Sequence, residues 1–100
     1  MDAVLRALIH STKTPPSPET IWSAVSWADS VQEWASRPEV GIGDDDTLSF
    51  EWQRGGKHLH VMFQKRDVEA YFAEDDGDQW ETTLPAGAEK LVSALSSFAV

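Results

Sequence analysis

Apolar and polar residues alternate in the middle of the chain and identify a pair of strands. Leu48, Phe50 and Trp52 alternate with polar residues across 47–54, which predicts a strand with one buried face. Gly55-Gly56 follows, and two glycines readily take the positive φ angles of a tight hairpin turn. A second strand at 57–64 then faces the first in fixed pairs: Trp52 with Leu59, Phe50 with Val61, and Leu48 with Phe63. Every predicted core pair is apolar, so the pattern and the turn chemistry agree.

Two further strands are predicted at 67–73 and 79–84 by the same alternation. A turn without glycine at Lys65-Arg66 joins the second and third strands, and it sets Val68 against Phe63, Ala70 against Val61, and Phe72 against Leu59. An acidic turn joins the third and fourth strands. A short strand from Glu39 to Ile42 is also compatible with the pattern. The sequence therefore predicts an antiparallel meander of three or four strands.

Helical spacing appears on both sides of these strands. Ser17 suits an N-cap and Pro18 the first helical position, which predicts a helix over 18–35 that ends before Pro38. A second helix is predicted over 86–98, where apolar residues recur on one side. Both helices are expected to pack on one face of the sheet, and the predicted fold class is α+β.

Length and composition set the broad class. The 100 residues suit a single domain, 1–100, with a short N-terminal helix at 1–10 and a Pro-rich linker at 11–16. The absence of Cys excludes disulfides and thiolate metal sites. No segment resembles a secretory signal or a membrane span of about 20 apolar residues, so a cytoplasmic protein without a membrane partner is expected. The net charge of −9 argues against direct binding to nucleic acid.

Most of this negative charge lies in one segment. Residues 67–85 carry seven Asp and Glu and no Lys or Arg. Six of the seven are candidate partner-binding residues: Glu69, Glu74, Asp75, Asp76, Asp78 and Glu81. Such a patch would steer the chain toward a protein with a basic surface. The alternative is a solubilising region that also discourages edge-to-edge pairing.

Trp22 breaks the pattern of the predicted helix over 18–35, because it falls in the middle of the polar side. A large aromatic residue there either packs against the segment before Ser17 or contacts a partner. Since aromatic residues are enriched at the centres of interfaces, Trp22 is a further candidate partner-binding residue.

A third constellation lies on the sheet face that points away from the core. His58 and His60 share this face, with Glu51 across from His60 and Tyr71 on its other side. Two imidazoles and a carboxylate can bind a divalent metal, which makes His58, His60 and Glu51 the metal candidates. The alternative is a solvated sheet face with a Glu–His pair. No nucleophile motif or phosphate-binding glycine loop is present, so neither catalytic residues nor a cofactor are predicted.

Several motifs between residues 15 and 72 occur together: a Pro-Glu helix start at 15–22, Pro38-Glu39-Val40, the strand Leu48-Ser49-Phe50-Glu51-Trp52, and the Gly-Gly hairpin with His58-Leu59-His60-Val61. In these motifs the chain resembles a group of small bacterial proteins without an assigned function. That group often has Trp-Asp-Gly before the prolines, where this chain has Ser11 to Thr14. The resemblance implies a bacterial or phage-related source and carries over no catalytic residue.

These features lead to three hypotheses. The first is a small acidic protein-binding module that is not an enzyme, such as an antitoxin, an immunity protein or an inhibitor of the anti-CRISPR kind, acting on a basic partner surface. The second is a non-catalytic accessory subunit that binds through Trp22 and apolar surface. The third is a metal-assisted enzyme that uses His58, His60 and Glu51. A homo-oligomer is compatible with each.

Overall fold

The computed structural model describes residues 16–31, 36, 38–43 and 45–99. The elements are α2 (Pro18–Val31), β1 (Glu39–Ile42), β2 (Leu48–Arg54), β3 (Lys57–Gln64), β4 (Asp67–Glu74), β5 (Gln79–Thr83), α3 (Ala88–Leu95) and the short 3-10 helix η1 (Ser96–Phe98). The helix predicted at 1–10, the linker up to residue 15 and the predicted end of the first helix at 32–35 lie outside the described residues. None of the described helices has the length and apolar character needed to cross a membrane.

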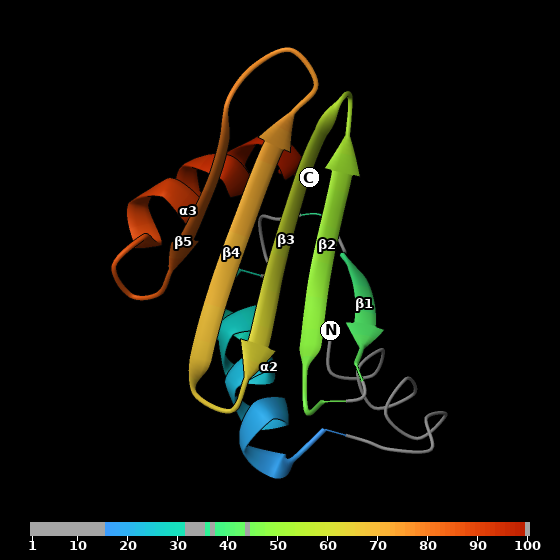
Figure 1. Cartoon of the computed structure of the whole chain (residues 1–100), viewed down its shortest axis with the longest axis vertical. Coiled ribbons are helices and arrows are strands. Elements are labelled where there is room, and N and C mark those ends of the chain that lie inside the picture. The colour runs from blue at the N-terminus through green and yellow to red at the C-terminus, as the bar shows by residue number, and fades with distance from the viewer. Residues whose placement is uncertain (1–15, 32–35, 37, 44, 100) are drawn as a thin grey trace.

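The fold class is α+β, as predicted, but the antiparallel sheet has five strands in the order β1-β2-β3-β4-β5 (Figure 1). The expectation of three or four strands is therefore corrected. The additional strand is β1, which has only four residues and a glycine at its third position. Its alternation is too short to separate a strand from a loop by pattern alone, and its pairing with β2 decides it.

The predicted register of the two central hairpins is confirmed. Trp52 pairs with Leu59, Phe50 with Val61 and Leu48 with Phe63 across β2 and β3. Across β3 and β4, Phe63 pairs with Val68, Val61 with Ala70 and Leu59 with Phe72. Gly55 and Gly56 take the positive φ angles of 56° and 80° that the two-residue turn requires.

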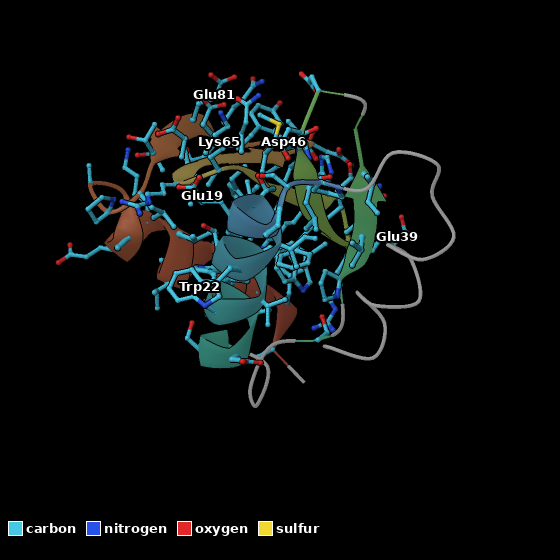
Figure 2. The ribbon with its side chains drawn as sticks, turned by 90° about the horizontal axis from the view of Figure 1, so that it is seen from below. Glu19, Trp22, Glu39, Asp46, Lys65 and Glu81 are labelled. Carbon is cyan, nitrogen blue, oxygen red and sulfur yellow. The ribbon has the colours of Figure 1, made fainter. Side chains whose placement is uncertain are left out.

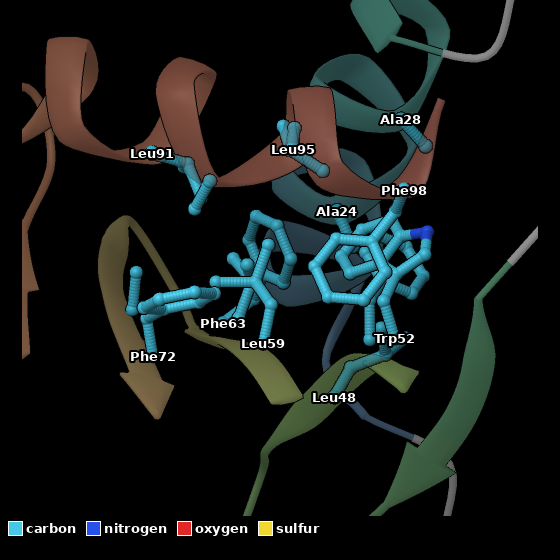
Figure 3. Close-up of a cluster of buried hydrophobic side chains, with 14 residues drawn as sticks. Ala24, Ala28, Leu48, Trp52, Leu59, Phe63, Phe72, Leu91, Leu95 and Phe98 are labelled. Carbon is cyan, nitrogen blue, oxygen red and sulfur yellow. The ribbon is translucent and has the colours of Figure 1, made fainter. Parts of the chain in front are cut away.

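Both helices lie on the same face of the sheet (Figures 1 and 3). Ala24 and Ala28 are fully buried and let α2 approach the strands closely. On the same helix, the centroid of the Trp27 ring lies 5.9 Å from that of Phe50, 6.0 Å from that of Trp52 and 5.7 Å from that of Phe63. Leu91, Leu95 and Phe98 from α3 and η1 complete the buried cluster shown in Figure 3.

The start of α2 is tied to two turns of the sheet by side-chain hydrogen bonds. Thr20 is fully buried, and its Oγ1 accepts from the backbone N–H of Lys65 at 2.7 Å and donates to Asp46 Oδ1 at 3.2 Å. Ser23 Oγ donates to the Lys65 carbonyl at 2.8 Å. Asp46 and Lys65 have positive φ angles of 63° and 54°, which are costly for residues with a Cβ. The contacts from α2 therefore stabilise turns that contain no glycine at these positions.

Asp46 also receives two hydrogen bonds from Ser17. The Ser17 backbone N–H donates to Asp46 Oδ1 at 2.6 Å, and the Ser17 hydroxyl donates to Oδ2 at 2.9 Å. The backbone hydrogen bond from Ser17 is the main cause that lowers the pKa of the Asp46 carboxyl below 3.8, its ordinary value. The sequence placed Ser17 at the helix start but gave no sign that its acceptor lies 29 residues away.

We expect Thr20→Val to destabilise the fold by about 1–3 kcal/mol, because it keeps the side-chain shape but leaves the part-buried backbone N–H of Lys65 without its acceptor. Urea unfolding measures the change in the free energy of unfolding. Ser26→Ala on the exposed side of α2 is the matched control and should change it by no more than about 0.5 kcal/mol. Equal effects of the two substitutions would show that the Thr20 hydroxyl does not hold the turn.

Asp46→Asn keeps the side-chain shape and tolerates the positive φ, but it removes the carboxylate. A carboxyl with a lowered pKa stabilises the folded state above its unfolded-state value, and this contribution disappears as the pH falls through the folded-state pKa. The wild-type protein should therefore be more stable than Asp46→Asn at neutral pH, and the difference should shrink as the pH falls below 3.8. Unfolding curves across this range measure it. A difference that persists unchanged down to about pH 2 would contradict the assignment.

Candidate interaction surface

One face of the sheet carries both helices, and no described helix or loop covers the other face, which is turned toward the viewer in Figure 1. We call this uncovered side the open face. Because successive side chains of a strand point to opposite sides, it receives every second residue of each strand. One row of directly paired residues crosses all five strands: Glu39, Glu51, His60, Tyr71 and Glu81.

Carboxylates dominate the charge of the open face. Its five acidic residues are all exposed: Glu39, Glu51, Asp67, Glu69 and Glu81. Within the part of the chain that the structure describes, this face carries no Lys or Arg. It is therefore a surface of one charge sign that spans the sheet.

The cations of the described strands point to the helix side. Arg54 Nη1 donates to the Ala99 carbonyl at 2.9 Å, and Lys57 Nζ donates to Ser97 Oγ at 3.4 Å. On α3, Lys90 Nζ lies 5.8 Å from the centre of the Trp80 ring.

The other two described cations, Lys65 and Arg66, belong to the turn between β3 and β4, beside the start of α2. There Arg66 Nε lies 2.9 Å from Glu19 Oε1. None of the described cations thus occupies a strand position on the open face, although Lys65 and Arg66 directly precede Asp67.

The centre of the open face is formed by three rings. The His58 and His60 rings are nearly parallel, with centroids 6.5 Å apart, and Tyr71 lies edge-on to His58 at 6.4 Å. The Tyr71 hydroxyl accepts a hydrogen bond from Gln79 Nε2 at 2.7 Å. These contacts orient the Tyr71 ring on a surface that is otherwise open to solvent.

The metal candidates do not converge. Glu51 is paired with His60 along the strands, as predicted, but its carboxylate lies 3.7 Å from Nε2 of the diagonal neighbour His58. The planes of the His58 and His60 imidazoles are nearly parallel, with centroids 6.5 Å apart. Among the described residues, no group of three or more His, Asp or Glu is placed to hold a metal ion.

A shallow hollow of about 520 Å³ lies on the open face over β3, β4 and β5. The side chains that line it from this face are His60, Met62, Glu69, Tyr71, Glu81 and Thr83. Seen along the strands, the sheet bends around α2, so that Glu81 and Glu39 point in different directions (Figure 2). The open face is therefore convex as a whole, with a local hollow at its β4–β5 side.

The six acidic residues selected from the sequence are separated by the structure. Glu69 and Glu81 lie on the open face, as part of the hollow. Glu74 and Asp78 line another hollow, under α3, together with Lys90. Asp75 and Asp76 are exposed at the tip of the β4–β5 turn. The six thus divide into three pairs on different parts of the surface, because a count along the segment combines strand faces with turns.

Two acidic residues of the open face, Glu39 and Asp67, were not among the sequence candidates. Asp67 alternates with Glu69 and Tyr71 along β4, so its position in the strand places it on the open face. Glu39 pairs directly with Glu51, which becomes visible only once β1 is known to be a strand. The alternation of residues along β4 was the signal that could have identified Asp67 from the sequence.

Trp22 is 72% exposed and lies on α2, so it belongs to the helix side of the molecule. Figure 2 shows it on the opposite side of the sheet from Glu81. A single flat partner surface therefore cannot contact Trp22 and the open face together. They are two separate candidate surfaces.

Comparisons with protein-family models, curated proteins and solved structures find no match to this chain. The resemblance to small bacterial proteins stays an expectation.

We expect Trp22→Gln to change the free energy of unfolding by no more than about 0.5 kcal/mol, because the ring is mostly outside the core. Trp27→Ala, in the same helix, should cost at least about 2 kcal/mol, because its partly buried ring packs against Phe50, Trp52 and Phe63. Urea unfolding compares the two variants. A loss of 2 kcal/mol or more in Trp22→Gln, roughly the value of a buried side chain, would show that Trp22 packs within the chain and is not a contact surface.

Proposed function

We propose that this protein is a small acidic binding module without catalytic activity, and that its open face binds a basic surface of a partner protein. The observation that carries the proposal is the uncovered sheet face with five carboxylates and no described Lys or Arg. The absence of converging metal ligands among the described residues makes the metal-assisted alternative the poorer account of His58 and His60.

The carboxylates of the open face form two groups, one on each side of β3, and each group acts together. Glu39 and Glu51 lie on neighbouring strands, as do Glu69 and Glu81. Neighbouring strands are about 4.8 Å apart, which is less than the Debye length of about 8 Å at physiological salt. Their fields therefore add at the surface, and a basic partner is attracted before contact. Such attraction raises the association rate, and it weakens as the salt concentration rises.

The shape of the open face favours a concave partner. A convex acidic surface fits into a basic cleft, including a cleft that binds nucleic acid, and it would exclude the usual occupant. An immunity protein, an antitoxin or an inhibitor of the anti-CRISPR kind works in this way, and we propose this setting for the protein. The charge of the open face supports a partner with a basic surface, and the convex shape supports a partner with a cleft.

A second candidate function uses the helix side. Trp22 is 72% exposed and Val92 is 55% exposed, and these are the large apolar side chains most exposed in the described structure. A non-catalytic accessory subunit that binds through Trp22 would depend on apolar contact, so its binding would change little with salt.

Hexalysine with blocked termini is a defined probe for the open face, because it offers positive charge without a fold. We expect salt-sensitive binding that weakens markedly in the double variant Glu69→Gln, Glu81→Gln. The double variant Asp75→Asn, Asp76→Asn removes the same charge from the exposed β4–β5 turn and is the matched control. Fluorescence anisotropy of labelled hexalysine at low salt measures both affinities.

The control separates a defined surface from overall charge. If the open face binds, the loss should be several-fold larger for the strand variant than for the turn variant. Equal losses would show that hexalysine senses only the net charge of −9, and they would contradict the proposed surface. Loss of binding in Trp22→Gln, with little effect of salt, would favour the accessory-subunit alternative.

A further inference from the structure

We infer that the hollow over β3, β4 and β5 receives an arginine side chain from the partner, and that it distinguishes arginine from lysine. This inference rests on the proposed function and specifies the chemistry of the same open face. The proposed occupant is an arginine side chain that projects from the partner's basic cleft into this local hollow, because the open face as a whole is convex.

The hollow combines a ring face with carboxylates on its two sides. Tyr71 lies directly opposite Glu81 on β5, and Glu69 precedes Tyr71 by two residues on β4, on the same face. Glu69 and Glu81 are therefore diagonal neighbours, and such positions are typically about 7–8 Å apart. A planar cation placed on the Tyr71 ring lies within reach of both carboxylates.

Guanidinium matches this arrangement better than ammonium. It is planar, stacks on aromatic rings, and offers several N–H donors that pair with carboxylates in fixed geometry. Lysine offers a compact, strongly hydrated charge that gains less from a ring in an open, solvated hollow. Charge alone therefore attracts both side chains, whereas the ring and the paired carboxylates favour arginine.

The Tyr71 ring is oriented before any ligand binds. Its hydroxyl accepts from Gln79 Nε2 at 2.7 Å, and its edge contact with His58 limits the tilt of the ring. The entropy cost of ordering this ring on binding is thereby reduced. Tyr71 contributes as a positioned contact surface and has no role in a chemical step.

Blocked hexaarginine and hexalysine, which have equal charge and length, provide the test. We expect hexaarginine to bind about threefold tighter or more, since stacking of a cation on an exposed ring gives a gain of this order. Tyr71→Leu should reduce this preference while salt-sensitive binding persists, whereas Tyr71→Phe should keep it. Fluorescence anisotropy on the full chain measures each affinity.

A second measurement uses the wild-type protein, so it does not depend on whether a variant folds. Tyr71 is the single tyrosine of the chain, so its ring resonances in an NMR spectrum have one source. Saturation with hexaarginine should shift them clearly more than saturation with hexalysine.

The outcomes distinguish a failure of the arginine inference from a failure of the proposed function. Equal affinities and equal Tyr71 shifts for the two peptides would overturn the arginine inference and leave the basic-partner proposal standing. A preference for arginine that is as large in Tyr71→Leu as in the wild-type protein would also overturn it, because stacking on the ring would then contribute nothing. Failure of both peptides to bind would contradict the proposed function, and the inference with it.

Discussion

The packing of Trp27 against Phe50 and Phe63 is the interaction on which the rest of the structure depends. It holds α2 to one face of the sheet, and α3 covers the remainder of that face through Leu91 and Leu95. Once one face is committed to the core, the alternation of side chains along each strand assigns the other residues to the open face. A shift of one residue in any strand would exchange the two sets, so the same burial that stabilises the fold also decides which carboxylates share a surface.

The two faces of the sheet differ in chemistry as a consequence. The helix side contains the core and the contacts of Arg54, Lys57 and Lys90 with the C-terminal elements and Trp80. The open face presents carboxylates around the rings of His60 and Tyr71. This separation needs no dedicated binding loop, because the strands that build the core also build the surface. The same separation places Trp22, on α2, on a different surface from the open face.

The sequence predicted the β2–β3 hairpin to the residue because two independent signals, the alternating pattern and Gly55-Gly56, require the same register. The β3–β4 register followed from the alternating pattern and a two-residue loop. The sequence was less informative where tertiary contacts replace local signals. The turn at Lys65 lacks glycine and is held by Thr20 and Ser23 from α2, which no local pattern reveals. β1 is too short to be recognised before its pairing with β2 is known. The candidate surface was predicted in part. Glu69 and Glu81 were selected, but a count along the segment combined them with the acidic residues of the β4–β5 turn. The alternation of side chains along the strands separates the two groups.

If cationic ligands bind the open face, and not the helix side or the β4–β5 turn, an NMR titration of the isotope-labelled protein with hexaarginine will locate the contact, because each side chain reports separately. We expect the largest side-chain shifts at Glu69, Tyr71 and Glu81, with little change at Trp22 or at the turn residues Asp75 and Asp76. Shifts centred on the turn or on α2, with the open face unchanged, would contradict it.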